Sequence, residues 1–213
     1  MRTLLLCLLL TITTAGWADE PAARVNGVDI GVLRLERYFS EYLQAQGRAL
    51  SSIRNPTLYK RLRDQALAEL IDKELLWQEA QRRGIVVSQA QVAAHMAELQ
   101  AAFASPALFE QRLADAGFDR AGYARYLHHE LAAQQVYAQL SAVEEPSQGE
   151  VEAFYQANRQ MLQHVQNQSD KPQVIPEQGL LLARDALVAQ RQAQQRQAVR
   201  QRLRQSATVE IAD

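Results

Sequence analysis

Signals for the start of a helix recur along this chain, and they constrain its fold more than any other feature. Ser88 is followed three residues later by Gln91, and Ser147 by Glu150, which is the spacing of a capping box. Ser105 precedes a proline, and Asp119 is also placed to cap a helix. Apolar residues at helical intervals follow each of these starts. The chain is therefore expected to be all-α.

Composition agrees with this class. Only 9 of the 213 residues are glycine and 6 are proline, while 47% are hydrophobic, which excludes collagen-like, disordered and disulfide-framework proteins. Gly47, Gly84 and Gly117 are placed to end helices. The apolar spacing predicts a bundle of helices over residues 35–43, 57–83, 89–103, 106–116, 119–145, 148–162 and 180–204.

Two short segments have the pattern of strands. Arg24–Ile30 places β-branched residues around an Asn-Gly pair, which is typical of a short strand with a turn, and Ala207–Ile211 alternates in polarity. A strand without a partner leaves its backbone groups unpaired. We therefore predict that Arg24–Val28 and Thr208–Ile211 pair in a two-stranded ribbon that joins the two ends of the domain.

The first eighteen residues have the features of a secretory signal peptide. Arg2 precedes an apolar run from Leu4 to Ile12, and Gly16-Trp17-Ala18 offers small residues for cleavage after Ala18. This run is short for a membrane span, which needs about 20 apolar residues. Export to the periplasm is expected, and an uncleaved signal that anchors the chain in the inner membrane is the alternative. Cleavage would remove Cys7, so no disulfide is expected.

Charge argues against nucleic acid as a partner. The chain has 23 basic and 24 acidic residues, so no overall positive field attracts a polyanion. Six arginines between Arg184 and Arg204 form a basic helix face. Such a face is either solvated or docked on an acidic partner.

The sequence contains no recognisable catalytic motif. None of its four histidines, His95, His128, His129 and His164, has a partner at the i, i+4 spacing that places two imidazoles on one helix face for a metal. The G-x-S-x-G signature of a nucleophilic serine is absent, and the glycines near Asn26 lack a phosphate-binding spacing. No catalytic residue, metal site or cofactor is predicted.

Methionine and phenylalanine gather around one short predicted helix. Met96, Phe103, Phe109 and Phe118 flank or occupy the region between Ser105 and Gly117. These side chains either belong to the core or form an adaptable surface that binds unrelated apolar chains. They are the candidate client-binding residues.

The order of motifs resembles that of a known family. Val25-Asn26-Gly27 is followed by Leu67-Ala68-Glu69-Leu70-Ile71-Asp72-Lys73-Glu74-Leu75-Leu76 and by Arg83-Gly84-Ile85, and later by Ala116-Gly117-Phe118 and by the helix with Phe154-Tyr155. The run from Arg24 to about Leu162 is similar to the N-terminal chaperone domain of the SurA and PpiD family of periplasmic folding factors. Residues 203–211 are similar to the closing helix and strand of that family.

One departure from the family is large. Members of the family carry a parvulin-type prolyl isomerase domain between the Phe154-Tyr155 helix and the closing helix, where this chain has only Gln163–Gly179. So short a polar segment is too small for a catalytic domain. The expected organisation is a signal peptide at 1–18, a chaperone domain at 24–162, a polar loop at 163–179, and a closing helix and strand at 180–213.

The resemblance implies a function in protein folding without catalysis. The expectation is an exported, ATP-independent, cofactor-free chaperone that binds apolar or aromatic segments of unfolded envelope proteins, including those of the outer membrane. One alternative is a degenerate peptidyl-prolyl isomerase. The other is an accessory subunit of an export or exopolysaccharide system with one dedicated partner. The oligomeric state is left open.

Overall fold

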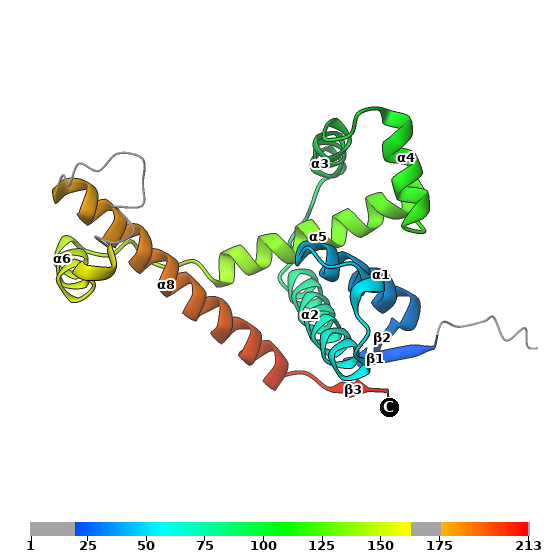
Figure 1. The fold of residues 1–213 in the computed structure, drawn as a ribbon, viewed down its shortest axis with the longest axis horizontal. Coiled ribbons are helices and arrows are strands. Elements are labelled where there is room, and N and C mark those ends of the chain that lie inside the picture. The colour runs from blue at the N-terminus through cyan, green and yellow to red at the C-terminus, as the bar shows by residue number, and fades with distance from the viewer. Residues whose placement is uncertain (1–19, 163–175, 213) are drawn as a thin grey trace, which may run out of the picture.

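A computed structural model describes residues 20–162 and 176–212, and its elements run in the order shown in Figure 1. A hairpin leads into a helical chain that ends in a third strand. The elements are β1 (Pro21–Val25), β2 (Val28–Gly31), α1 (Val32–Ala45), the 3-10 turn Leu50–Ser52, α2 (Pro56–Arg82), α3 (Gln89–Ala101), α4 (Pro106–Asp115), α5 (Arg120–Leu140), α6 (Gln148–Ala157), α8 (Pro176–Gln205) and β3 (Val209–Ile211). The expected all-α class with a small sheet is confirmed.

The sheet joins the two ends of the described chain. Its order is β2-β1-β3, with β3 antiparallel to β1 and Val25 opposite Val209. The predicted pairing is thus present, but the sheet has three strands instead of two. Asn26 and Gly27 both have positive φ, 51° and 84°, which matches the tight turn that reverses a hairpin, so Val28–Gly31 returns along β1 as an additional strand.

Side-chain caps begin α3, α4, α5 and α6 at the residues that the sequence predicts, and Asn55 is an additional cap on α2. Ser88 and Ser147 form complete capping boxes, and the side chains of Asn55, Ser105 and Asp119 accept hydrogen bonds from the first turns of α2, α4 and α5. Each cap satisfies backbone N–H groups that lack a partner within the helix. These starts are therefore determined by residues adjacent in sequence.

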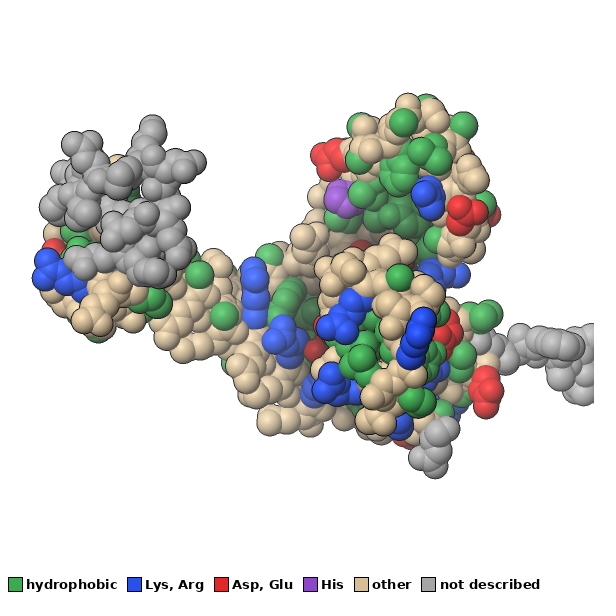
Figure 2. Space-filling model, viewed as in Figure 1, with side chains coloured by type: hydrophobic (Ala, Val, Ile, Leu, Met, Phe, Trp, Pro, Cys, Tyr) green, Lys and Arg blue, Asp and Glu red, His purple; other side chains and the backbone are tan. Residues whose placement is uncertain are grey.

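Three clusters of buried side chains divide the molecule. The sheet body, formed by β1–β3, α1 and residues 56–75 of α2, is built around Ile30, Leu35 and Phe39. The arm is formed by α3, α4 and residues 120–131 of α5. Its core includes Phe109 and is shared with residues 76–80 of α2, residues 132–140 of α5 and Val199 of α8. The distal lobe, formed by α6 and residues 180–186 of α8, lies at the far end of α8 from the sheet (Figure 1), and a narrower stretch joins it to the rest of the molecule in Figure 2.

Helix α8 connects the distal lobe to the sheet body, and its arginines bind acids of this same chain. Arg184 pairs with Glu145, with Nε and Oε2 3.1 Å apart, and Arg191 pairs with Glu150. Arg204 pairs with Asp72 of α2. Hydrogen bonds from the Ser147 backbone N–H and Arg191 lower the pKa of Glu150 to about 2. Much of the basic face is therefore used within the fold.

Several boundaries differ from the sequence prediction. Helix α5 ends at Leu140 instead of residue 145. Within the described residues, helix α8 is present from Pro176 instead of residue 180. Helix α3 ends at Ala101, and α6 ends at Ala157, where Asn158 leaves the helical conformation before helical backbone resumes at 159–162. The predicted signal peptide and most of the predicted loop 163–179 lie outside the described residues.

Candidate functional site

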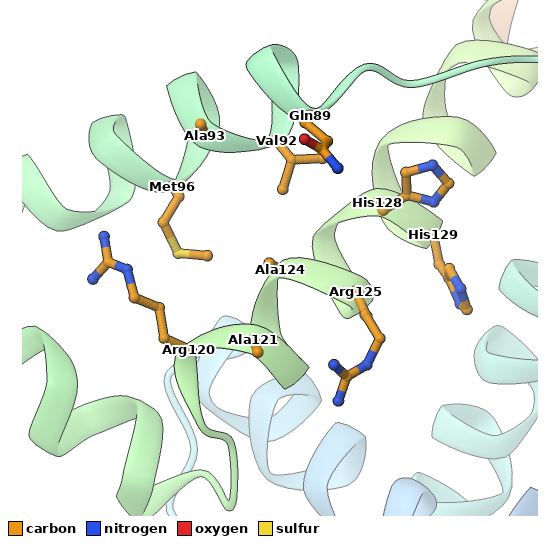
Figure 3. Close-up of a pocket in the computed structure, with 10 residues that line it drawn as sticks. All are labelled: Gln89, Val92, Ala93, Met96, Arg120, Ala121, Ala124, Arg125, His128 and His129. Carbon is orange, nitrogen blue, oxygen red and sulfur yellow. The ribbon is translucent and has the colours of Figure 1, made fainter.

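A groove of about 680 Å³ lies between α3 and α5 on the arm. Its floor is apolar, as the side chains of α3 and α5 in Figure 3 show. We call it the α3/α5 groove. Its lining residues are Gln89, Val92, Ala93, Met96, Arg120, Ala121, Ala124, Arg125, His128 and His129.

The groove follows from the local sequence of its two helices. The Ser88 capping box begins α3, and Val92 and Met96 lie one turn apart on the face toward α5. On α5 the opposing residues are Ala121 and Ala124, whose short side chains fill little of the space between the helices. The hollow therefore arises where large α3 side chains meet small α5 residues.

Basic and imidazole side chains form the rim, and all of them come from α5. Arg120 extends toward Met96, whereas Arg125 and His129 lie on the other side of α5 in Figure 3. The His129 ring stacks on Trp77 of α2 with a centroid distance of 4.0 Å. Burial, and secondarily the neighbouring His128, lowers the pKa of His129. The uncharged form of His129 is thereby favoured beside the indole.

The four residues predicted to bind clients all lie in the arm, but only Met96 lines the groove. Phe109 is 2% exposed, and its ring packs against Phe103 and Tyr123 at centroid distances of 5.4 and 6.4 Å. Phe118 is half-buried beneath the Arg37 guanidinium, 4.0 Å from its centroid. The four side chains therefore lie in the same part of the arm, but Phe109 is part of the buried core of the arm.

A second hollow, which we call the tyrosine cleft, lies on the other flank of α3, with a volume of about 850 Å³. It is lined by Tyr38, Tyr123, Tyr126 and Tyr137, by the carboxylates of Glu69, Asp72 and Glu130, and by Lys73, Arg200, His95 and neutral residues of α2, α3 and α5. Tyr38 donates a hydrogen bond to Glu69 with a 2.7 Å separation. Burial, and then the charge of Glu130, raises the pKa of Tyr126. The lining of this cleft is more polar and more acidic than that of the groove.

Sequence reasoning missed most of the groove. Ala121, Ala124 and His128 come from the α5 face that meets α3, and alanines at this spacing give no signal of a binding site. The Met-Phe pattern located the arm, because large apolar residues mark it. The space left by small residues becomes visible only when α3 and α5 are packed.

The described residues form hollows between helices. Within 20–162 and 176–212, no three His, Cys, Asp or Glu side chains gather in a way that could hold a metal ion. None of the helices in those ranges combines the length and apolar character needed to cross a bilayer. None of the described elements forms a parvulin-type domain. The arrangement suits apolar segments that bind by burial between helices.

Comparisons with known proteins place the chain in a family. None of the curated proteins matches it. A solved structure from work on PEB4 and the periplasmic protein Cj1289, described as two structurally related SurA-like chaperones in Campylobacter jejuni, matches with a TM-score of 0.52. The sequences are 12% identical, and the match covers 90% of this chain and 98% of that chain, which shows a shared fold. The family model for the SurA-like N-terminal domain matches residues 4–137, more than half of the chain, so this protein belongs to the SurA-like N-terminal domain family.

Proposed function

We propose that this protein is a periplasmic, ATP-independent chaperone that holds apolar segments of unfolded envelope proteins in the α3/α5 groove. The observation that carries the proposal is an apolar groove on the arm of a SurA-like domain. The groove has a volume of about 680 Å³, and at its floor Met96, which is 4% exposed, presents part of a flexible thioether that can adapt to different side chains. Binding that is weak at each contact suits clients that must later be released.

The signal peptide expected from the sequence supports a periplasmic location. Cleavage after Ala18 would leave only Asp19 and Glu20 before β1, which starts at Pro21 and is central in the sheet. The mature chain would therefore keep every described strand and helix. Removal of Cys7 would leave a thiol-free protein that folds on its apolar cores in an oxidising compartment.

The principal experiment measures aggregation of an unfolded outer-membrane barrel protein diluted from urea. The mature chain, in a few-fold molar excess and without ATP, is expected to slow aggregation of this client and of a second, unrelated one. Protection of only one dedicated partner would favour the accessory-subunit alternative. Absence of protection for any client would contradict the proposal.

A matched pair of variants tests the groove itself. Ala93 and Ala121 line the groove and are exposed, whereas Ala94 and Ala97 are exposed on α3 outside it. The double variant Ala93→Gln, Ala121→Gln should lose most of the protection because amide side chains fill the apolar space. The control Ala94→Gln, Ala97→Gln should keep it. Equal protection by both variants would place client binding elsewhere.

Catalysis of prolyl isomerisation is not expected. An isomerase must lower a barrier of about 18 to 20 kcal/mol with fixed polar groups in a shaped pocket. Cis-to-trans conversion of an Xaa-Pro tetrapeptide is therefore expected to stay at the uncatalysed rate. A rate constant that rises linearly with the concentration of repurified protein would instead support the isomerase alternative.

A further inference from the structure

The α3/α5 groove has an unbalanced charge. Its lining contains Arg120, Arg125, His128 and His129 and no Asp or Glu. Arg120 is held at the rim by Glu110 and by Gln100, which partly offsets its charge. Arg125 is exposed and makes no ion pair within residues 20–162 and 176–212. The unpaired charge of the groove is therefore that of Arg125, which extends from α5 on the side away from α3 and faces the residues that flank an apolar segment, not the segment itself.

The opposite flank of α3 lacks this imbalance. In the tyrosine cleft, Lys73 pairs with Glu130, and Arg200 lies 3.9 Å from a carboxylate oxygen of Asp72. Glu69 adds a carboxylate that accepts a hydrogen bond from Tyr38. The basic residues of the cleft are thus matched by acids of the same chain. The two flanks of α3 therefore differ in the balance of their basic and acidic side chains.

We propose that the α3/α5 groove prefers apolar polypeptide segments flanked by Asp or Glu. This inference rests on the function proposed above and specifies the client segments that the groove takes. An apolar stretch occupies the floor formed by Val92, Met96 and Ala124, and the flanking carboxylates lie beside the rim. Exposed pairs of this kind contribute little each, so two flanking acids should tighten binding roughly three- to tenfold.

Three peptides of about twelve residues provide the test. They share one apolar centre and carry Glu, Gln or Lys at both ends, and their dissociation constants for the mature chain are measured by fluorescence anisotropy. The Glu-flanked peptide should bind most tightly and the Lys-flanked peptide most weakly. The preference should largely disappear between about 50 and 500 mM NaCl, because salt screens exposed charges.

Substitutions of the exposed residues Arg125 and Ala93 test whether the charge preference arises in the groove. Arg125→Gln should weaken binding of the Glu-flanked peptide with little effect on the Gln-flanked one, whereas Arg61→Gln, an exposed arginine on α2, should change neither. Ala93→Glu places a carboxylate in the groove and should reverse the order of the Glu- and Lys-flanked peptides. Ala97→Glu, which adds the same charge outside the groove, is its control.

The outcomes separate this inference from the proposed function. Equal binding of all three peptides, lost in the Ala93→Gln, Ala121→Gln variant, would overturn the charge preference and leave the chaperone groove standing. Laurate, an apolar chain with one carboxylate, is measured as a fourth probe. If it binds more tightly than any peptide, the groove is a site for amphiphiles and the preference for polypeptide segments is overturned. No binding of any peptide by a chain with an intact helical signal would overturn both.

Discussion

The sheet body and the arm are held together by different kinds of contact. In the sheet body, residues far apart in sequence meet: Asn26 accepts a hydrogen bond from the Thr208 backbone N–H at 2.9 Å and donates to Gln78 at 2.8 Å. The arm depends on caps such as Ser88 and Ser105, which act within three residues. The sheet body therefore forms completely only when the two ends of the chain pair, whereas the helices of the arm are specified by residues adjacent in sequence.

This difference also bears on function. The arm meets the rest of the molecule chiefly through α5, and an extended segment at 85–88 leads to it from α2, where Gly84 has a φ of 67°. Elements with few long-range contacts open at a lower free energy than the core. A binding groove that must admit varied clients is better placed on such an element than beside the sheet.

The largest effect is expected from one buried ring in each region. Phe39 is 1% exposed and packs edge-on against Tyr59, so Phe39→Ala should cost about 3 to 5 kcal/mol and lower the melting temperature by roughly 10 °C or more. Phe109→Ala removes an equally buried ring from the arm and should produce an early, separate transition in a thermal scan. A single transition shifted equally by both variants would show that the regions unfold as one unit.

Removal of β3 should have the next largest effect. Deleting Thr208–Asp213 breaks the pairing with β1, removes the bond to Asn26 and uncovers part of the sheet-body core. The melting temperature should fall by several degrees, since about 1 kcal/mol shifts a chain of this size by about 2 to 4 °C. Glu210→Gln, which keeps the strand, is the control. An unchanged melting temperature would mean that the third strand adds no stability.

The junction between the regions should respond to pH. Hydrogen bonds from Arg82 and Arg83 lower the pKa of the buried Glu79 carboxylate to about 2, against burial, which acts in the opposite direction. Because the folded-state pKa lies below the unfolded value, Glu79 stabilises the fold above the unfolded pKa, and this contribution disappears as the pH falls from about 5 to 2.

Urea unfolding of Glu79→Gln measures this contribution. The variant should be less stable than the wild type by roughly 1 to 3 kcal/mol at pH 7, and the difference should vanish near pH 2. Glu98→Gln, which removes an exposed carboxylate from the arm, is the control. A difference that stays constant across this pH range would assign the effect of the substitution to packing.

The difference between local and long-range contacts also explains which features could be predicted from the sequence. The starts of α3, α4, α5 and α6 follow from caps at Ser88, Ser105, Asp119 and Ser147, which need no knowledge of the rest of the chain. Pairing of the two end strands was accessible because unpaired backbone groups are costly. The groove was not, because it depends on how α3 crosses the small residues Ala121 and Ala124. Phe109 shows the converse: its size signalled importance, but its burial could come only from packing.

The smallest effect is expected from a single cap in the arm. The Ser88 side chain accepts a hydrogen bond from the Gln91 backbone N–H, and the Gln91 side-chain oxygen accepts one from the Ser88 backbone N–H. Ser88→Ala removes the side-chain half of this box and should cost about 1 kcal/mol, whereas Ser88→Asp keeps an acceptor and should cost less. Because α3 forms one wall of the groove, the loss should raise hydrogen exchange in residues 89–92 and weaken peptide binding, while exchange in β1 and α1 stays unchanged. Equal acceleration of exchange in β1 would show that the cap is coupled to the sheet body, and the distinction between locally and globally held regions would then have to be abandoned.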